Sequence, residues 1–431
     1  MVQLNTEGMK QRKTAIQPNG KVTTQSSLGN PNKLQDDHPA GPVKHGGPMQ
    51  ALRIFLFTIF FTISCIFIHG AQLLGLPLYF YNRDYFYAYM AVTKQYFGLL
   101  ATVGTQWWSP TVIRVSGDSS VSGQLKQLAD GRLELDFPER IVLIANHQIY
   151  TDWLYLWWAS YTAGLHGHIY IILKESLKYV PVIGPAMMLY NFIFMARKWE
   201  KDQPRLRHRL EKLNTRHSGP MSGSEGSAQL DPMWLLIFPE GTNLSRNTRN
   251  RSAAWSAKSG TPDVKHGLLP RSTGLQFCLS ELKDTVEYLY DCTICYEGTS
   301  PGQLASEIFT LRAVYFEGRP PKSVNLHWRR FKVSDIPVDD HKAMEEWLLK
   351  RWQEKDEIID YYQRTGRLPA DPDAVRIAGK DKPGNGYIET EVKPKSQLEF
   401  CQIFTPVLAA AFVGNILVKM VNLVTAGKLH S

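Results

Sequence analysis

A long segment without a charged side chain constrains this chain more than any other feature. From Ile54 to Asn82 there is no Lys, Arg, Asp or Glu, and the part from Ile54 to Ile68 is almost entirely aliphatic and aromatic. A helix needs about 20 apolar residues to cross a bilayer. The segment therefore predicts a membrane helix, and it begins too far from Met1 to be a cleavable signal peptide.

Two further segments predict contact with a membrane. Tyr85–Trp108 is aromatic and apolar apart from Lys94, and it predicts a second membrane-contacting helix. A hairpin that spans the bilayer and a helix pair lying in one leaflet both fit the pattern. Ile403–Ala426 has Lys419 as its only charge and predicts a third membrane segment, with a buried helix as the alternative. Seven Lys and Arg against three acids precede the first segment, which predicts a cytosolic N-terminal tail.

The composition fits a chain that contacts lipid and binds an anionic partner. Hydrophobic residues make up 43% of the sequence and the net charge is +9. A basic chain attracts a membrane surface, a phosphorylated substrate or nucleic acid. We expect no nucleic-acid partner, because the sequence has no zinc-finger spacing and no RNP-type signature. The cysteines are odd in number and mostly far apart, which favours reduced thiols, and Cys292 and Cys295 read as two residues of one strand.

The middle of the chain predicts an α/β fold, in which a mostly parallel mixed sheet is flanked by helices. Strands are expected at 132–137, 141–145, 169–173, 234–238, 286–296 and 324–333, and helices at 152–163, 204–214, 275–282 and 343–362. The expected organisation is a disordered tail (1–50), a membrane-associated helix pair (51–110), an α/β domain (111–335), a helical extension (336–366), a linker (367–399) and a C-terminal membrane segment (400–427). A Gly/Ser-rich insertion is expected at 218–227.

Two apolar strands of this domain end in polar loops that predict a catalytic site. The strand at 141–145 leads into Asn146-His147, and Asp152 follows five residues after the histidine. This is where a general base and its orienting carboxylate would lie if the loop were an active site. The second strand ends in Phe238-Pro-Glu-Gly-Thr242, where Gly241 permits close backbone approach to a ligand.

These two blocks resemble the glycerophospholipid acyltransferases of the PlsC type. Two more blocks of that family are recognisable, one ending in Arg197 and one centred on Leu269-Pro-Arg271. All four occur in family order over roughly residues 110–335. The similarity is greatest to the eukaryotic branch that acts on lysophosphatidic acid, lysocardiolipin and lysophosphatidylinositol. Asn243, where that branch often has Asp, and the longer spacing between the second and third blocks are departures.

The resemblance implies transfer of an acyl group from acyl-CoA, as co-substrate, to a glycerol hydroxyl of a lysophospholipid, with no other cofactor. It implies that His147 is the general base and that Asp152 orients it. Glu240, Gly241 and Thr242 would contact the acceptor, and Arg197 and Arg271 would hold its phosphate, with Lys174 and Lys178 as weaker candidates. The basic clusters at 205–209 and 246–251 would face the membrane or CoA, or simply solvent. The expected location is the endoplasmic reticulum membrane, with the catalytic domain in the cytosol.

Two other classes of function remain open at this point. The chain could be a catalytically silent member of the same fold that binds lipid, although His147, Asp152, Glu240 and Arg271 are all present. It could also be a lipid hydrolase, but no G-x-S-x-G elbow occurs in the sequence. No histidine spacing predicts a metal site. The glycosylation sequons at Asn243 and Asn250 lie beside the proposed site and are expected to be unused.

Overall fold

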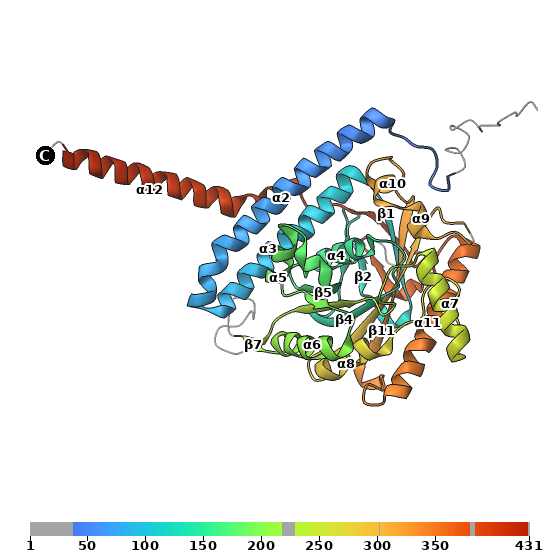
Figure 1. Ribbon diagram of the computed structural model, residues 1–431. Helices are drawn as coiled ribbons and strands as arrows, with labels where there is room; N and C mark the ends of the chain where they lie inside the picture. The colour runs from blue at the N-terminus through green and yellow to red at the C-terminus, as the bar shows by residue number, and fades with distance from the viewer. Residues whose placement is uncertain (1–37, 218–228, 301, 380–383, 430–431) are drawn as a thin grey trace, which may run out of the picture.

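The computed structural model describes residues 38–217, 229–300, 302–379 and 384–429. Most of the expected disordered tail, residues 1–37, lies outside the described residues, and so does the expected Gly/Ser-rich insertion at 218–227. Figure 1 shows one large sheet covered on both sides by helices, with the last helix projecting away from the rest of the chain.

The central sheet confirms the predicted mixed α/β class. Within the described residues it has eight strands in the order β13-β1-β11-β10-β4-β9-β5-β6. Their bounds are β1 Val112–Gly117, β4 Arg140–Ala145, β5 Ile169–Lys174, β6 Ile193–Met195, β9 Met233–Ile237, β10 Tyr288–Tyr296, β11 Ser323–Lys332 and β13 Ile388–Glu391. The strands from β10 to β6 are parallel neighbours, β11 is antiparallel to β10, and β13 is antiparallel to β1.

Helices pack against both faces of this sheet (Figure 1). Those of the first face are α2 Gly47–Tyr81, α3 Arg83–Trp108, α4 Asp152–Thr162 and α5 Ile183–Leu189; those of the second are α6 Trp199–Leu213, α8 Ser272–Leu282 and α11 His341–Thr365. The remaining α-helices are α7 Arg246–Ser259, α9 Ala305–Ile308, α10 Leu311–Tyr315 and α12 Thr405–Leu429. Short 3-10 turns occur at η1 Ser119–Val121, η2 Glu175–Tyr179, η3 Val333–Asp335, η4 Pro372–Ala374 and η5 Gln397–Ile403.

Burial on both faces explains the unbroken apolar runs of the central strands. Ile141 and Leu143 of β4 point to the α4 side, whereas Val142 and Ile144 point to the α8 side, and all four are 0% exposed. A strand covered on both faces requires apolar residues at every position rather than at alternate ones. The runs at 141–145 and 234–238 were predictable for that reason.

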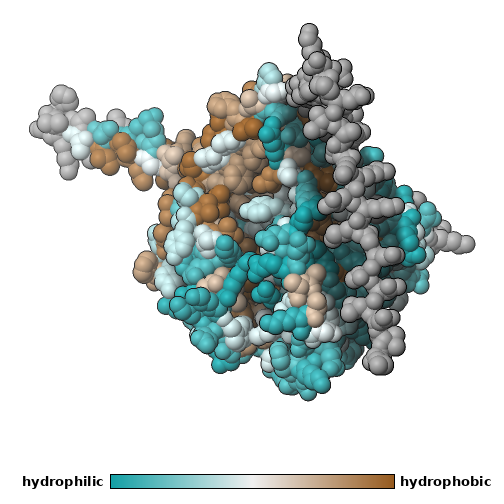
Figure 2. Space-filling model, turned by 45° about the vertical axis from the view of Figure 1, so that its right-hand side comes forward, coloured by the Kyte–Doolittle hydropathy of each residue, from teal (hydrophilic) through white to brown (hydrophobic). Residues whose placement is uncertain are grey.

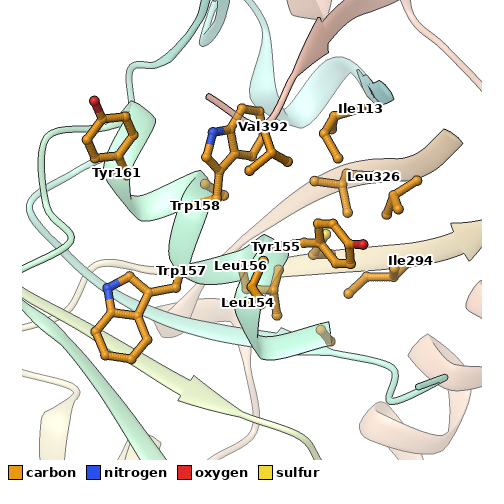
Figure 3. Packing of buried hydrophobic residues seen from close by; sticks show 14 of the residues in the cluster. Ile113, Leu154, Tyr155, Leu156, Trp157, Trp158, Tyr161, Ile294, Leu326 and Val392 are labelled. Carbon is orange, nitrogen blue, oxygen red and sulfur yellow. The ribbon is translucent and has the colours of Figure 1, made fainter. Parts of the chain in front are cut away.

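Helix α4 anchors the first layer. Figure 3 shows its aromatic residues, among them Tyr155, Trp157 and Trp158, among buried side chains of the sheet and of helix α4 itself. Helix α3 approaches closely at Gly98, where a Cβ atom would lie 2.5 Å from Nε1 of Trp157. A side chain at this position would collide with Trp157, so the glycine lets α3 pack closely against α4. Helix α2 packs on α3 in turn.

The described residues contain two helices long and apolar enough to cross a membrane, α2 and the part of α12 from Thr405 to Asn422. Exposed apolar side chains of α2 are Leu52, Phe55, Ile59, Ile63, Ile66 and Leu73. In Figure 2 the upper part of the visible face, at the height of α2 and α3, is mostly brown, whereas the lower part is mostly teal. Tyr85–Trp108 was expected to be a second membrane-contacting helix; it forms α3, which is a helix with its buried residues running from Phe86 to Thr105.

Two expectations about the chain's organisation are wrong. Residues 38–50 do not belong to a disordered tail, since the backbone N–H groups of Lys44 and His45 donate to the Glu317 carbonyl and α2 begins at Gly47. Residues 367–399 are not a plain linker, because they supply β13 to the central sheet. They also supply β12 (Val375–Ile377) to a small sheet with β2 (Leu125–Gln127) and β3 (Leu133–Leu135). The strand expected at 132–137 is confirmed as β3, which belongs to this small sheet. A two-stranded ladder, β7 (Arg216–His217) with β8 (Gln229–Leu230), completes the described strands.

The cysteines behave as reduced thiols. All five are free, and Cys292 and Cys295 are buried residues of β10, as the strand pattern predicted. Burial raises the pKa of both thiols, so they remain protonated at neutral pH and are poor nucleophiles.

Candidate active site

The two loops singled out in the sequence leave the same edge of the sheet side by side. Strands β4 and β9 are parallel neighbours, with Leu143 beside Leu236 in register. After β4 the chain crosses β9 to reach β5, whereas after β9 it crosses β4 to reach β10. Ligands bind outside the carboxyl ends of strands at such a switch point, where the connections diverge.

His147 and Asp152 form a hydrogen-bonded dyad in the loop after β4. Nδ1 of His147 lies 2.8 Å from Oδ2 of Asp152, so the carboxylate fixes the Nδ1–H tautomer and leaves Nε2 as an acceptor. The imidazole stacks on the Phe238 ring, with centroids 4.3 Å apart. The His147 side chain is 18% exposed and that of Asp152 is 0% exposed. The ring is thus held on two sides and still reachable by a substrate.

Asp152 is held by His147 and by two further donors, one in the same loop and one in β10. It is the first residue of α4, its Oδ2 accepts the backbone N–H of Ile149 at 3.0 Å, and its Oδ1 accepts the hydroxyl of Tyr296 at the end of β10. Burial raises the pKa of Tyr296, so this hydroxyl stays protonated and can donate. Asn146 bonds both backbone groups of Ile294, at 3.0 and 2.8 Å, and fastens the loop to β10. Tyr296 was missed in the sequence because it lies outside all four family blocks.

The turn after β9 brings the two predicted arginines together. Gly241 has φ +71°, a left-handed conformation that favours glycine, and its carbonyl accepts Nη2 of Arg197 at 2.9 Å. The backbone N–H of Arg271 donates to the Pro239 carbonyl at 2.9 Å. Arg197 and Arg271 are both exposed beside this turn, and Thr242 is half-buried at its end. The four blocks therefore converge at one place, as their residue types suggested.

Asp202 sets the backbone conformation of Arg197 and thereby the direction of its side chain. The backbone of Arg197 has φ +63°, a left-handed conformation that costs a non-glycine residue roughly 1–2 kcal/mol. The buried Asp202 carboxylate accepts the backbone N–H of Ala196 at 2.7 Å and that of Lys198 at 2.9 Å. These two hydrogen bonds hold the backbone on either side of Arg197, so the first turn of α6, which contains Asp202, imposes the left-handed conformation of Arg197. This role of Asp202 could not be predicted from the residue types around it.

Glu240 lies beneath the turn rather than in the open site. It is 3% exposed, its Oε1 accepts Nε1 of Trp352 at 3.4 Å, and its Oε2 has no hydrogen-bond partner among the described residues. Burial raises the pKa of Glu240 to about 7, against a smaller opposing effect of His147. Glu240 was expected to contact a glycerol hydroxyl directly, but a substrate does not reach this buried side chain from the open site. Its position instead suits a structural role in supporting the turn.

Glu240→Gln is expected to flatten the pH dependence of stability. A rise in pKa from 4.5 to about 7 means that the folded chain keeps a proton that the unfolded chain releases between those values. The free energy of unfolding therefore falls as pH rises through this window, by about 3 kcal/mol for this group. Chemical unfolding between pH 5 and 8 should show this slope in the unaltered chain and in the exposed control Glu345→Gln. Parallel curves for Glu240→Gln and the unaltered chain would contradict the assignment.

Helix α11 supports the third and fourth blocks from below. Besides Trp352, it supplies Asp356, whose carboxylate accepts the backbone N–H groups of Lys265 and His266 at 2.8 and 2.7 Å. Lys355 of the same helix donates to Asp291 in β10 at 2.5 Å. The turn, the fourth block and β10 are thus tied to one helix that follows them in sequence.

The basic clusters noted in the sequence are largely ion-paired. In the first cluster, Arg205 contacts Glu175 at 2.9 Å and Arg207 contacts Glu281 at 3.3 Å; Glu175 also contacts Lys178, at 2.7 Å. In the other cluster, Arg246 pairs with Glu307 and Arg249 pairs with Asp263. These contacts use much of the positive charge that could otherwise face CoA or a membrane.

A cavity of about 240 Å³ adjoins the dyad. Gln148, which follows His147, lines it together with Tyr296, the partner of Asp152. Its wall is rich in amide, hydroxyl and basic groups, including Asn250, Thr299, Tyr362, Gln363, Arg249 and Lys265. Within the described residues no three His, Cys, Asp or Glu side chains are grouped to hold a metal ion.

Two family models match this chain, and several known proteins are similar to it. Residues 124–297 match the acyltransferase family, and residues 315–398 match the family described as acyltransferase C-terminus. An uncharacterized acyltransferase of Schizosaccharomyces pombe is 38% identical over 86% of this chain and 97% of its own length. The 2-acyl-1-lysophosphatidylinositol acyltransferase of Saccharomyces cerevisiae is 38% identical over 73% of this chain and 85% of its own length. A probable 1-acyl-sn-glycerol-3-phosphate acyltransferase of Arabidopsis thaliana is 33% identical over 54% of this chain and 56% of its own length.

Proposed function

Because the chain belongs to the acyltransferase family, we propose that it transfers a fatty acyl group from acyl-CoA to a free glycerol hydroxyl of a lysophospholipid. The observation that carries this proposal is the 2.8 Å dyad of His147 and Asp152, set beside a turn flanked by two exposed arginines. Acylation of a phosphorylated alcohol requires a base that takes the proton of its hydroxyl group, and guanidinium groups nearby that bind its phosphate.

The reaction follows from the position of the imidazole. Nε2 of His147 takes the proton of the acceptor hydroxyl as its oxygen attacks the thioester carbonyl, and Asp152 stabilises the imidazolium. The tetrahedral intermediate then expels the thiolate of CoA, which recovers the proton from His147. The substrate supplies the nucleophile, so no acyl-enzyme forms.

The residues around the turn are suited to hold the acceptor. Arg197 uses one N–H on the Gly241 carbonyl, and a guanidinium has five such donors, so others remain for a phosphate. Arg271 extends from the N-terminus of α8 past Gly241, where the missing side chain leaves room for a ligand. We assign phosphate binding to these arginines, and contact with the glycerol part to Gly241 and Thr242.

Lysophosphatidylinositol is our first choice of acceptor, and lysophosphatidic acid is the second. The relative named for a lysophosphatidylinositol is 38% identical to this chain, against 33% and 28% for relatives named for 1-acyl-sn-glycerol-3-phosphate. The cavity beside the dyad also favours the larger headgroup. Its amide and hydroxyl side chains can both donate to and accept from a ring of hydroxyls, whereas lysophosphatidic acid would leave them without a partner.

We propose that the chain works at the endoplasmic reticulum membrane with its catalytic domain in the cytosol. Helix α2 has exposed apolar residues, whereas α3 is buried on one side along most of its length, where it packs against α4 and the rest of the domain. A hairpin anchored in this way fits an arrangement in which α2 lies in one leaflet beside the domain. Helix α12 stands free of the domain (Figure 1) and is the better candidate to cross the bilayer.

Purified membranes with radiolabelled oleoyl-CoA and separately supplied lysolipids would test the function. Label entering phosphatidylinositol, and requiring added lysophosphatidylinositol, is the expected result. Label in phosphatidic acid alone would select the second acceptor. Release of free oleate without any acceptor would indicate a hydrolase, and no turnover by folded protein would indicate a silent lipid-binding chain.

Asp202→Ala is expected to raise KM for the lysolipid about tenfold, with a smaller change in kcat, because it frees the backbone that aims Arg197. Asp202→Asn should be intermediate, since an amide has one acceptor oxygen. Glu200→Ala, an exposed acid in the same turn, is the matched control. In an Arg197→Ala background the Asp202 substitution should add little to KM. Full additivity would mean that Asp202 acts on stability rather than through Arg197.

A further inference from the structure

A second basic cavity lies at the opposite edge of the sheet from the dyad. It has a volume of about 320 Å³ and is lined at the amino ends of β5 and β9, by Tyr170 and Met233, and by the first turns of α3. The dyad and the arginine turn lie at the carboxyl ends of the same strands. The cavity therefore belongs to neither the dyad nor the turn.

The cavity gathers positive charge that the described residues do not neutralise. Its basic lining residues are Arg83, Lys94, Arg209, Lys212 and Arg216. Among the described residues none of these five makes an ion pair. The acids of the lining, Asp84 and Asp231, are instead directed at His217, at 2.6 and 3.7 Å.

The buried side chain of Lys94 lines the inner end of this cavity. It is 2% exposed, donates to the Ile169 carbonyl at 3.1 Å and lies 3.7 Å from the centre of the Tyr170 ring. An ammonium has three protons, and only this one hydrogen bond is formed among the described residues. Burial lowers the pKa of Lys94 well below its ordinary value, so an anion in the cavity would stabilise its charged form.

The rim cations repel one another. After burial, Arg209 and Arg83 are the causes that lower the pKa of Lys212. Cations that are close together without an acid between them are destabilising unless an anion joins them. A phosphate group, which accepts several charge-assisted hydrogen bonds at once, is the ligand that best fits such a cluster.

The neighbouring surface indicates where the phosphate comes from. The end of α2, which adjoins the cavity through Arg83, carries Tyr79, Phe80 and Tyr81, and the last two are 88% and 83% exposed. Exposed aromatic residues at a helix end are typical of the boundary between membrane and water. Arg83 itself lies 5.2 Å from the centre of the Tyr79 ring. A lipid headgroup at this boundary would be within the rim of the cavity.

We propose that this cavity binds the phosphate of an anionic membrane lipid, as a site separate from the catalytic one. The lipid would fasten the tip of the α2–α3 hairpin to α6 and to the amino ends of β5 and β9. Its function is to hold the catalytic domain on an anionic membrane surface, independently of which lysolipid is acylated.

Hydrogen exchange of the full chain in detergent micelles tests the site directly. The probes are dioctanoyl phosphatidylglycerol, dioctanoylglycerol, which has the same chains without a phosphate, and inorganic phosphate. The phosphate lipid alone is expected to protect the backbone at 83–91 and 209–217. Arg83→Gln/Lys212→Gln, which alters two exposed side chains, should require at least about tenfold more lipid for the same protection. The control Lys342→Gln/Lys350→Gln removes two exposed charges from α11 and should change nothing.

Several results would overturn the proposal. These are the absence of protection at both segments, equal protection by dioctanoylglycerol, and a rim variant that responds like the unaltered chain. Protection by inorganic phosphate at the concentrations that suffice for the lipid would overturn the assignment to a membrane lipid. Exchange at 238–250 reports the catalytic site separately, so binding there is distinguished from binding at the hairpin.

Discussion

Replacing His147 by alanine is expected to reduce the rate of acyl transfer by about 10²- to 10⁴-fold, the usual contribution of a positioned general base. The ring makes one hydrogen bond, to Asp152, and one stacking contact, to Phe238. Neither contact connects distant parts of the fold, so the variant should stay folded. What it loses is the group that removes the proton of the acceptor hydroxyl.

The comparison needs a histidine that is remote from the site. His341, an exposed residue at the start of α11 that contacts Gln276, is suitable, and His341→Ala should transfer label at the unaltered rate. Rates are measured as incorporation of labelled acyl chains, with thermal unfolding of each variant in parallel. A His147→Ala chain that retains more than a third of the rate would refute the mechanism.

Lys355→Met is expected to lower the free energy of unfolding by about 3–5 kcal/mol, the cost of breaking a buried ion pair. The ammonium group is buried and donates to Asp291 at 2.5 Å, to the Cys292 carbonyl at 2.9 Å and to Thr293 at 3.1 Å. Burial alone would raise the pKa of Asp291, but Lys355 and Arg329 outweigh it and the pKa is lowered. Without Lys355 the carboxylate keeps only Arg329.

Denaturant unfolding in detergent, followed by tryptophan fluorescence, measures this loss. Lys350→Met, an exposed lysine of the same helix, controls for the change of residue type. Lys355→Met/Asp291→Leu should be more stable than Lys355→Met alone, because it removes the buried carboxylate that has lost one of its two cations, while Arg329 still pairs with Glu354. Equal losses in the Lys350 and Lys355 variants would show that the buried pair contributes nothing to stability.

The parts of the fold that could be predicted are those whose sequence pattern follows from local burial. Strand β4 from Ile141 to Ala145 and strand β9 are apolar at every position because both faces are covered. Helix α7 was missed, since its sequence of arginines, asparagines and serines has no apolar period. Strands β12 and β13 were missed because they are short and partly exposed, and their pairing with β2 and β1 joins residues 250 or more positions apart.

The site divides in the same way. His147, Asp152, Arg197 and Arg271 belong to blocks with fixed residue types, so they could be placed together from their order in the chain. Tyr296 and Trp352 could not, because their contacts with Asp152 and Glu240 span 144 and 112 positions. The burial of Glu240 was also hidden, since a glutamate in a turn is ordinarily exposed.

The dependence of the site on α11 sets an order of events during synthesis. A ribosome releases His147, Asp152 and the Gly241 turn well before it has made Trp352, Lys355 and Asp356, which brace that turn and β10. Strand β13, which closes the sheet beside β1, is made later still. Helix α2 is thus made before the residues that brace the turn and β10, so the braced site can form only after most of the chain has been synthesised.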